Sequence, residues 1–534
     1  MSRTVLILGC GIMQEPALRI ASEMGWRVVA VDGNPEARGR HLAQHFFPVD
    51  LRDTEGIIEI ARRLSADGGL EGVFTTGTDF SVSVARVAKA MNLPGHSLEA
   101  AICASDKARM RRRFQQQGVP SPPFIEINPA EVSPRGDSSG IGERELFARA
   151  STIPGPWVVK PADSMGARGV VRIDHLRELP QALETARSRS SSGRALLESY
   201  MEGPEYSLDA LIEDGQLIRC GLADRHIVYP PRFIEIGHSI PADLSSETAE
   251  KLWNIFERGI KALGLSSGAA KGDIKLTPQG PMVGEIAARL SGGFMSGYTY
   301  PYASGIQPTR AALRLAVGLP ASIPTPQKQL FCAERALISI DGTLKELTGV
   351  EKALSLPGVM DVFLHNEIGD RLSFPRSNVE KVANVIATAP QSAAAVNQAL
   401  SALRCLELTL NPSDSRTGVY LDSFASFPPD AFDITEDPDF SQFLNKLWRT
   451  HPPRPSRGAP VSLPRILSPP PSRCTDYIGR SITDLLSILA GKKLIRVGRG
   501  SQETGASAFL SDFWRALIRG GLLGIRWYLE QASP

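Results

Sequence analysis

The sequence predicts a multidomain protein that begins with an open α/β domain and continues with α+β domains. The chain has 534 residues, which at roughly 150 residues per domain corresponds to three or four domains. In its first part, short apolar runs alternate with amphipathic stretches, a pattern typical of parallel βαβ units. Further along, apolar runs at 271–276 and 281–286 flank a turn around Gly280 and predict a β-hairpin, which indicates an antiparallel sheet.

Composition excludes several classes of protein. Hydrophobic residues make up 42% of the chain, enough to bury large cores. Lys and Arg total 59 against 57 Asp and Glu, a balance that argues against a protein built to coat nucleic acid. The six cysteines lack CxxC or zinc-site spacing, and the N-terminus lacks a signal-peptide pattern. No apolar run reaches about 18 residues. We therefore expect a cytoplasmic protein with no nucleic-acid partner and no transmembrane segment.

The turn after the first predicted strand carries part of a dinucleotide-binding fingerprint. Strands are expected at 4–8, 28–31 and 72–75, and helices at 15–24, at 56–64 and from Asp79 onward. Gly9 and Gly11 follow the first strand and Asp32 ends the second, as in NAD-binding Rossmann domains. Gln14, however, stands at the third glycine position. The pattern favours a Rossmann-like domain whose tight turn holds no cofactor, and bound NAD is the alternative.

Changes of sequence character divide the chain into five expected segments. They are a Rossmann-like domain (1–104), a larger α+β domain (105–326), a further α+β part (327–410), a Pro-rich linker or arm (411–475) and a helical extension (476–534). Between Pro428 and Pro471, 11 of 44 residues are proline, a density expected to exclude helices and central strands.

The C-terminal extension is expected to form helices at 481–497 and 506–531. The second helix carries an apolar stripe interrupted by Gly520 and Gly521, which comprises Trp514, Leu517, Ile518, Leu522, Ile525 and Trp527. Such a stripe predicts docking on the main body or on a partner chain, and contact with a membrane surface is the alternative.

A strand and a glycine-rich turn predict a phosphate site around Lys160. The strand Val158-Val159-Lys160-Pro161 is followed by a turn with Gly166 and Gly169 that leads into a second strand. Glycines let backbone N–H groups approach phosphate oxygens, and a lysine on the strand adds a point charge. The segment is no Walker loop, since no Gly-Lys-Ser/Thr opens a helix. A plain hairpin is the alternative.

The predicted hairpin carries two carboxylates that suit a magnesium ion. Asp273 and Glu285 lie on its two strands at positions roughly opposite each other. Paired oxygen ligands on rigid strands fit Mg²⁺, which keeps waters and bridges nucleotide phosphates. Arg289, four residues later, can add a fork of donors for a phosphoryl group or a carboxylate. Two surface acids without a metal are the alternative.

A short acidic connector follows the apolar strand that contains Leu196 and Leu197. It runs from Glu198 to Glu205, and a second strand follows it. Backbone groups of such a connector can read an adenine edge, and a carboxylate can accept hydrogen bonds from both ribose hydroxyls.

Taken in order, these elements resemble the ATP-grasp superfamily over about residues 1–410. More narrowly, the chain is similar to the carboxylate–amine ligase branch, which includes L-amino-acid (dipeptide) ligases and carbamoyl-phosphate-synthase-like proteins. The resemblance implies a pre-ATP-grasp domain, a lid subdomain at about 150–212, and ATP held between two antiparallel sheets. ATP and Mg²⁺ are then the expected cofactors, Mn²⁺ is an alternative metal, and a homodimer is expected.

The resemblance also implies a role for each matching residue. Its ATP-binding positions are Lys107, Lys160, Ser164, Gly166, Gly169, Glu198, Ser199, Tyr200, Met201 and Glu205. The metal ligands would be Asp273 and Glu285, and the catalytic residues Arg289, Lys160 and His238. The substrate would meet Glu235, His238, Arg289, Gly292 and Gly293. An ordinary structural histidine is the alternative for His238. One departure is Ala287, where many family members carry an Asn that completes a second metal site.

The expected activity is ATP-dependent amide formation. A small-molecule carboxylate would be activated as an acyl phosphate, and a small-molecule amine would then displace the phosphate. Two other functions stay open: a carboxylase or carbamoyl-phosphate-type reaction, and a nucleotide-binding scaffold without catalysis.

Overall fold

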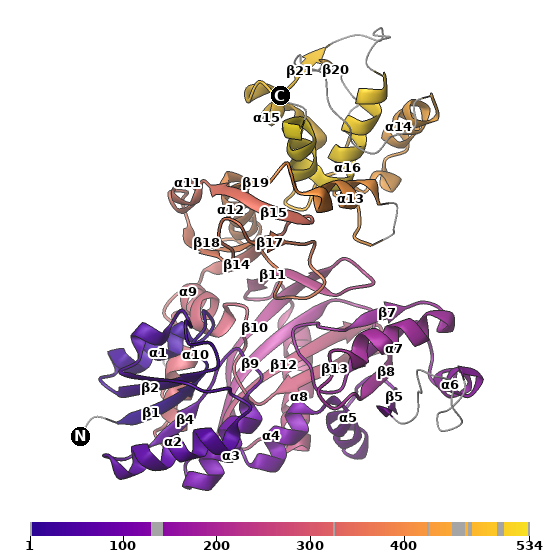
Figure 1. The fold of residues 1–534 in the computed structure, drawn as a ribbon. Coiled ribbons are helices and arrows are strands. Elements are labelled where there is room, and N and C mark those ends of the chain that lie inside the picture. The colour runs from indigo at the N-terminus through magenta and orange to yellow at the C-terminus, as the bar shows by residue number, and fades with distance from the viewer. Residues whose placement is uncertain are drawn as a thin grey trace. The chain divides into compact units, whose positions relative to one another are not determined.

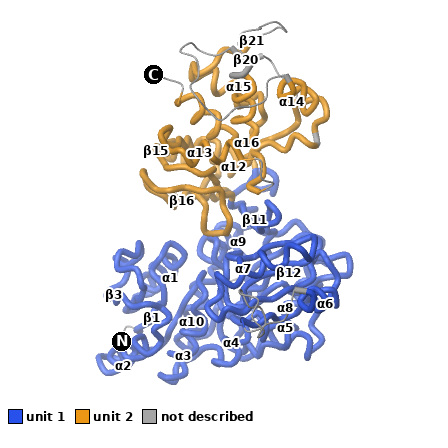
Figure 2. Tube along the Cα trace, turned by 45° about the vertical axis from the view of Figure 1, so that its right-hand side comes forward, with its two compact units in different colours: residues 1–334, 388–396 blue, residues 335–387, 397–534 orange. Residues whose placement is uncertain are grey.

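The computed structural model describes residues 3–129, 143–323, 326–423, 427–450, 465–467, 472–498 and 507–531. The chain forms two compact units, coloured separately in Figure 2. The first comprises residues 1–334 and 388–396, and the second comprises residues 335–387 and 397–534.

The first unit opens with a parallel sheet in the strand order β3-β2-β1-β4, of which Figure 1 labels β2, β1 and β4. The strands are β1 (Thr4–Leu8), β2 (Arg27–Asp32), β3 (His45–Pro48) and β4 (Gly72–Phe74), and the helices between them and after them are α1 (Glu15–Glu23), α2 (Thr54–Ala66) and α3 (Ser81–Met91). Val5 and Ile7 of β1 join one apolar cluster, while Leu6 and Leu8 join another. Because successive side chains point to opposite faces, both faces of this sheet are buried, and the predicted α/β domain is confirmed.

The glycine turn after β1 is closed by the protein's own side chains. The Asp32 carboxylate accepts a hydrogen bond from the Cys10 N–H at 2.8 Å. The Gln14 side-chain oxygen accepts one from the Gly11 N–H at 3.1 Å, and its amide donates to the Thr76 carbonyl. Asp32 and Gln14, which would face a dinucleotide in an NAD-binding domain, therefore form hydrogen bonds that stabilise the turn. These bonds agree with the predicted tight turn.

A small antiparallel sheet follows, in the order β5-β8-β6-β7. Its strands are β5 (Phe124–Ile127), β6 (Trp157–Pro161), β7 (Val171–Ile173) and β8 (Ala195–Ser199), and the helices α6 (Glu143–Ala150) and α7 (Leu179–Arg187) accompany it. Val159 and Leu197 point into one apolar cluster with Leu183 of α7. Lys160, the next residue after Val159, therefore points to the opposite face.

The larger antiparallel sheet of the first unit contains the predicted hairpin. Its strands are β9 (Glu205–Glu213), β10 (Gln216–Val228), β11 (Ile234–Ile240), β12 (Gly268–Thr277) and β13 (Gly280–Ala287). Strand β9, which begins inside the range expected for the lid, lies between β10 and β12. Helix α8 (Ser246–Leu263) and helix α5 (Lys107–Gln116) pack on this sheet through Phe256 and Phe114. The unit also contains α4 (Leu98–Ser105), α9 (Tyr300–Ser304) and α10 (Pro308–Ala316).

The second unit combines short sheets with helices. Strand β15 (Gly342–Thr348) pairs with β17 (Arg371–Leu372) and β19 (Glu407–Leu410), and β16 (Val359–Leu364) pairs with β18 (Ala383–Ala389). Strand β14 (Phe331–Leu337) crosses from the first unit into the second. The helices are α11 (Val350–Leu354), α12 (Ser392–Cys405), α13 (Ser415–Asp422), α14 (Pro438–Thr450), α15 (Ile482–Gly491) and α16 (Ser507–Gln531).

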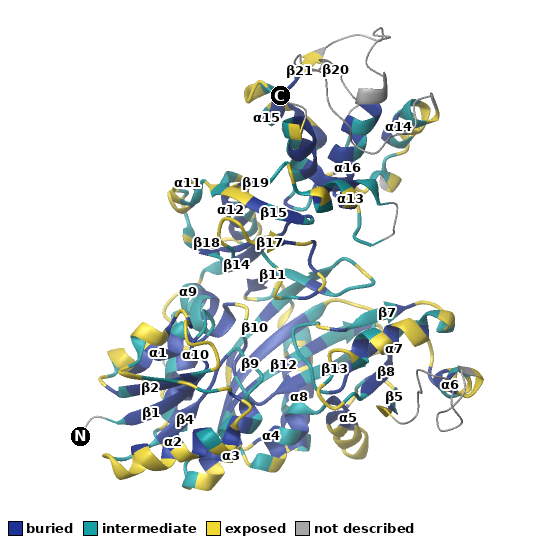
Figure 3. Ribbon diagram, in the orientation of Figure 1, coloured by how far each residue is buried: buried dark blue, intermediate teal, exposed yellow. Residues whose placement is uncertain are grey.

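The apolar stripe of α16 is covered by residues of its own unit. Trp514 is fully buried, with its ring 5.7 Å from those of Phe440 and Phe443. The Trp527 indole N–H donates to the Asn411 carbonyl at 3.0 Å. Figure 3 shows the buried inner side of α16 in dark blue. No helix in the described part of the chain has the length and apolar character needed to cross a membrane.

Two local predictions in the C-terminal part are wrong. The Pro-rich segment was expected to exclude helices, yet α14 spans Pro438–Thr450. Its only proline is Pro438 at the first position, where a missing N–H costs nothing, and the following residues through 451 are free of proline. The expected helix at 481–497 ends at Gly491, Lys493 takes a positive φ of 58°, and 496–498 form strand β21 (Arg496–Gly498), which pairs with β20 (Arg465–Leu467). The residues between 450 and 465 lie outside the described residues.

Candidate active site

Lys107 is placed at the start of helix α5, where it reaches both the glycine turn and the hairpin. Asp106 caps this helix by accepting hydrogen bonds from the Ala108 and Arg109 N–H groups at 3.0 Å. The Lys107 ammonium donates to the Ser164 carbonyl at 2.6 Å and lies 3.2 Å from a Glu285 carboxylate oxygen. One lysine therefore links the predicted phosphate turn to the predicted metal ligand.

Lys160 belongs to a buried charge triad with Arg111 and Glu198. The Lys160 ammonium lies 2.7 Å from one Glu198 oxygen, and the Arg111 Nε donates to the other at 2.8 Å. Arg111 and Glu198 are almost fully buried. Burial alone would raise the pKa of Glu198, but Arg111 and Lys160 together hold it below its ordinary value. Both carboxylate oxygens of Glu198 are thus bound by Lys160 and Arg111. Its position beside adenine stays a prediction.

The glycine turn between β6 and β7 has the backbone that its sequence predicts. Gly166 and Gly169 take positive φ values of 66° and 75°, which favour glycine. Asp163 anchors the turn by accepting hydrogen bonds from Ser190 at 2.7 Å and from the Ser192 N–H at 2.9 Å. Burial raises the pKa of Asp163, but these serine donors lower it more, so the anchor stays ionised.

Asp273 and Glu285 are cross-strand partners in the β12–β13 hairpin. Burial opposes ionisation of Glu285, but Lys107, Lys271 and Lys160 lower its pKa to about 2. Two carboxyl side chains on neighbouring strands fit a divalent cation that keeps waters and takes its other oxygens from phosphate. Within the described residues no group of three or more His, Cys, Asp or Glu side chains is arranged around a metal position.

Arg225 of β10 ties together three carboxylates that have separate predicted roles. It lies 2.8 Å from an Asp273 oxygen and 2.7 Å from a Glu235 oxygen, and it also pairs with Glu205. Lys271 contacts Asp273 from the next position but one along β12. Arg225 and Lys271 therefore neutralise Glu205, Asp273 and Glu235, the predicted ligands of ribose, metal and substrate. A metal ion or substrate that binds these carboxylates must compete with the two protein cations.

Tyr200 in the predicted adenine hinge has two cations near its ring. Lys275 and Arg172 lie 4.8 Å and 4.5 Å from the centre of the Tyr200 ring, and Phe233 stacks on it at 6.0 Å. The Lys275 ammonium also donates to the Met201 carbonyl at 3.0 Å. Ser199, just before the hinge, donates from its hydroxyl to the Pro154 carbonyl at 2.7 Å.

His238 has the environment of a structural histidine. It is fully buried, one ring nitrogen lies 2.9 Å from the Thr299 hydroxyl, and the other lies 3.3 Å from a Glu334 oxygen. Both nitrogens therefore face protein groups, and these contacts favour the structural alternative over a direct contact with substrate.

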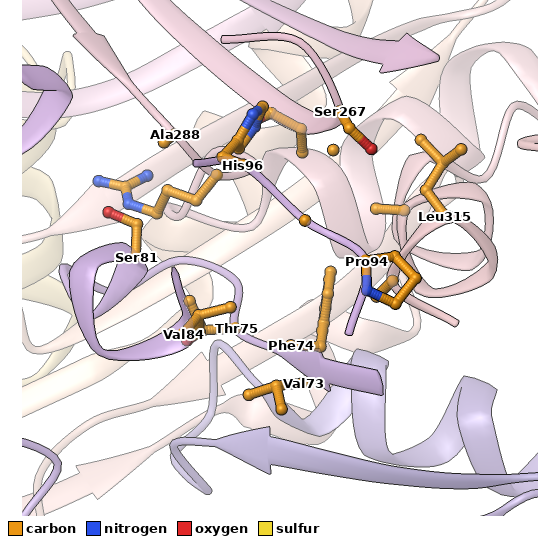
Figure 4. A pocket seen from close by; sticks show the side chains of 16 residues that line it. Val73, Phe74, Thr75, Ser81, Val84, Pro94, His96, Ser267, Ala288 and Leu315 are labelled. Atoms are coloured by element: carbon orange, nitrogen blue, oxygen red, sulfur yellow. The ribbon is translucent and has the colours of Figure 1, made fainter. Parts of the chain in front are cut away.

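Arg289 follows β13 and borders a small cavity. Its guanidinium donates to the Leu290 carbonyl at 3.0 Å, while its buried Nε has no hydrogen-bond partner among the described residues. Figure 4 shows the cavity, lined mainly by apolar side chains such as Val84 and Leu315, with His96 beside them. Its volume is about 60 Å³, and a cavity needs about 10–15 Å³ by this measure to hold one water, so it has room for a few waters. It is therefore far too small for a nucleotide.

The glycine pair beside Arg289 touches the N-terminal domain. A Cβ on Gly292 would lie 3.1 Å from the Gly77 carbonyl oxygen, and Gly293 takes a positive φ of 61°. The Ser291 N–H donates to an oxygen of the buried Asp209 at 2.8 Å. This close backbone approach, which a side chain on Gly292 would crowd, brings the loop 75–80 against the predicted substrate loop.

Some of the predicted residues lie together in the first unit, namely Lys107, Lys160, Glu198, Asp273 and Glu285, whereas His238 contacts other groups. Glu285 contacts Lys107 and is influenced by Lys160. Asp79, which no motif singled out, interacts electrostatically with both Arg289 and Glu285. The chemical roles of these residues stay predictions. Their charges nevertheless interact, although Asp79, Lys107, Lys160 and the segment with Glu285 and Arg289 are far apart in the sequence.

Three charged residues of this site were missed by reasoning from sequence: Arg111, Arg225 and Asp79. A signal existed for Arg111, which stands one helical turn after Lys107 on the face of α5 that also carries the buried Phe114. Arg225 alternates with apolar residues on a strand, and nothing local shows that three acids meet it. Asp79 was expected to begin a helix, but α3 begins at Ser81.

Comparison with family models gives three matches along the chain. Residues 18–95 match the ATP-grasp N-terminal domain, residues 153–297 match the ATP-grasp domain, and residues 335–411 match the L-amino acid ligase C-terminal domain 2. The second match spans the glycine turn, the hinge and the hairpin described above.

Relatives of known name support the same placement. The protein y4rH of Sinorhizobium fredii is 26% identical over 368 residues, which cover 68% of this chain and 73% of that protein. Carnosine synthase 1 of Gallus gallus is 26% identical over 380 residues, which cover 66% of this chain but 40% of the synthase. Among solved structures, the L-amino acid ligase from Bacillus licheniformis has a TM-score of 0.64 at 21% identity, covering 77% of this chain and 99% of the ligase. Together with the site, these matches identify an ATP-grasp domain at 153–297 and make the chain similar to the carboxylate–amine ligase branch of the ATP-grasp superfamily.

Proposed function

We propose that this chain catalyses ATP-dependent amide formation between a small-molecule carboxylate and a small-molecule amine, with release of ADP and phosphate. One observation carries the proposal: the carboxylates Asp273 and Glu285 are cross-strand partners on one hairpin and lie against the lysine and arginine cations that a triphosphate requires. The match of residues 335–411 to an L-amino acid ligase domain makes amino acids the first substrates to test.

The proposed reaction has two steps. A carboxylate oxygen attacks the γ-phosphorus of ATP, and the bond to the bridging oxygen breaks with its electron pair leaving on ADP. The amine first gives one proton of its ammonium form to solvent, and its nitrogen then attacks the acyl carbon through the lone pair. The C–O bond to phosphate breaks with its electron pair leaving on phosphate, and the nitrogen loses a second proton as the amide forms. Neither step needs a covalent nucleophile from the protein, so the protein supplies charge and position.

Each predicted residue then has a physical task. Lys107 and Lys160 hold phosphate oxygens, and Arg289 offsets charge on the transferred phosphoryl group. The glycine turn covers the phosphates and excludes water. Asp273 and Glu285 would hold Mg²⁺, which adds positive charge at the β- and γ-phosphates when bound. Mn²⁺, which also prefers oxygen ligands, is proposed to substitute for it.

We further propose that the chain acts as a homodimer and that its C-terminal extension docks on the body of its own chain. Burial of Trp514 and the hydrogen bond from Trp527 to Asn411 support the docking part of the proposal.

Measurement of ADP release tests the proposed function. Purified protein is incubated with MgATP and a matrix of L-amino-acid pairs, with each amino acid also tested alone. We expect ADP release that depends on a particular pair, with one amide formed per ADP. Bicarbonate-dependent ADP release without any amine would instead favour a carboxylase, and ATP binding without turnover across the matrix would favour a scaffold.

A further inference from the structure

Asp79 lies in the loop between strand β4 and helix α3, and its position is fixed from two sides. The Thr75 hydroxyl donates to the Leu8 carbonyl at 2.7 Å, which attaches the loop to β1. On the other side the Gly77 backbone packs against Gly292 in the predicted substrate loop. The loop therefore holds Asp79 at a defined place beside the site.

Asp79 has no structural task that would explain a carboxylate there. The N-cap of α3 is Phe80, and no side chain caps that helix. Among the described residues, Asp79 makes no hydrogen bond and no ion pair. Its carboxylate nevertheless interacts with the cations Arg289, Lys107 and Arg168 and with the acid Glu285. Partial burial raises its pKa despite the three cations, and an ammonium group bound beside it would favour its ionised form.

The other carboxylates of the site are already engaged by protein cations. Glu198 forms ion pairs with Arg111 and Lys160, and Glu285 forms one with Lys107. Glu205, Glu235 and Asp273 all pair with Arg225, and Asp273 also pairs with Lys271. Asp79 thus stands out as an acid beside Arg289 that is free to meet a ligand.

An amine substrate meets a physical obstacle at this site. It must bring its ammonium group to an acyl carbon next to Arg289, Lys107 and Arg168, which repel it. Taking an ammonium out of water among cations is costly unless an opposite charge accompanies it. A rigidly held carboxylate near Arg289 meets this need.

We propose that Asp79 binds the ammonium group of the amine substrate and orients its nitrogen toward the acyl phosphate. The inference rests on the proposed amide-forming function and adds the residue that recognises the second substrate. Glu235 stays the predicted partner of an ammonium on the first, carboxylate-donating substrate, so the two acids serve different amino acids.

The test compares Asp79→Asn with the wild type, using the pair of two different L-amino acids that gives the fastest ADP release. A hydrogen bond to a charged group contributes about 1.5–3 kcal/mol, so kcat/KM for the amine is expected to fall about 10- to 100-fold, mainly through KM. In parallel, hydroxylamine replaces the amine and traps the acyl phosphate as a hydroxamate. Hydroxylamine is largely uncharged at neutral pH, so hydroxamate formation is expected to fall by less than about threefold.

Asp67→Asn is the matched control, because Asp67 is an exposed acid in the same domain without a side-chain contact. Asp79→Glu, which keeps the charge, is expected to recover part of the amine kcat/KM. The proposal is overturned if Asp79→Asn lowers hydroxamate and amide formation equally, or if it leaves the KM for the amine unchanged. If the wild type releases no ADP with any pair, the proposed function itself fails and this role fails with it. If the wild type is active and Asp79→Asn leaves the kcat/KM for the amine unchanged, only the proposed role of Asp79 is overturned.

Discussion

Replacement of Glu285 by alanine is expected to lower pair-dependent ADP release by about 10²–10³-fold or more, the typical cost of losing one preorganised charge. Glu285 contacts Lys107, so its loss removes a predicted metal ligand and leaves a buried lysine without that counter-charge. The measurement is steady-state ADP release with MgATP and the best amino-acid pair. Arg289→Ala is expected to behave in the same way because it removes the positive charge that is proposed to face the transferred phosphoryl group.

Glu247→Ala on the exposed start of α8 is the matched control, and it is expected to keep wild-type turnover. The pKa of Glu285 is lowered to about 2, so its carboxylate stays ionised above that pH. Loss of activity in mildly acidic buffer is therefore not expected to come from Glu285. Full pair-dependent turnover by Glu285→Ala would contradict the assignment of this site.

Replacement of Glu198 by alanine is expected to destabilise the first unit by about 3–5 kcal/mol, because Arg111 and Lys160 would remain buried without a counter-charge. The measurement is the free energy of unfolding in urea, taken from the transition in which the first unit unfolds. Glu184→Ala, at an exposed site on α7, is the control and is expected to change stability by less than about 0.5 kcal/mol.

The same triad predicts a pH dependence. Arg111 and Lys160 hold the pKa of Glu198 below its ordinary value even though burial alone would raise it. Its stabilising contribution is therefore fully present above the unfolded pKa of about 4.3 and is lost as the pH falls through the lowered folded pKa. Glu198→Ala should lose less stability between neutral and acidic pH than the wild type. A variant with wild-type stability at neutral pH would show that the triad is not the support inferred here.

Local pattern was sufficient to predict the elements that carry the site. The turn at Gly280 sets the register of its hairpin as far as the pair Ile274 and Val283, and an irregularity in the pairing beyond it brings Asp273 opposite Glu285. The positive φ values of Gly166 and Gly169 agree with a turn that glycine alone adopts readily. In these cases the information lies within a few residues, so the sequence contains it.

The parts that were missed depend on distant partners or on the exact position of a residue. Arg225 meets its three acids only because β9, β10, β11 and β12 lie side by side, an order that no local pattern encodes. Helix α14 was missed because proline was counted over the whole segment, whereas its only proline stands at the helix start. The task of Glu198 was likewise hidden, since its partner Arg111 is 87 positions away.

Isotope transfer tests the central claim most directly. The carboxylate substrate is labelled with ¹⁸O in both carboxyl oxygens, the reaction is run with MgATP and the amine, and the released phosphate is analysed by mass spectrometry. Activation as an acyl phosphate predicts one ¹⁸O in each phosphate released, with ADP as the other product. Unlabelled phosphate, or label found in AMP, would contradict transfer of the γ-phosphoryl group to the carboxylate at this site.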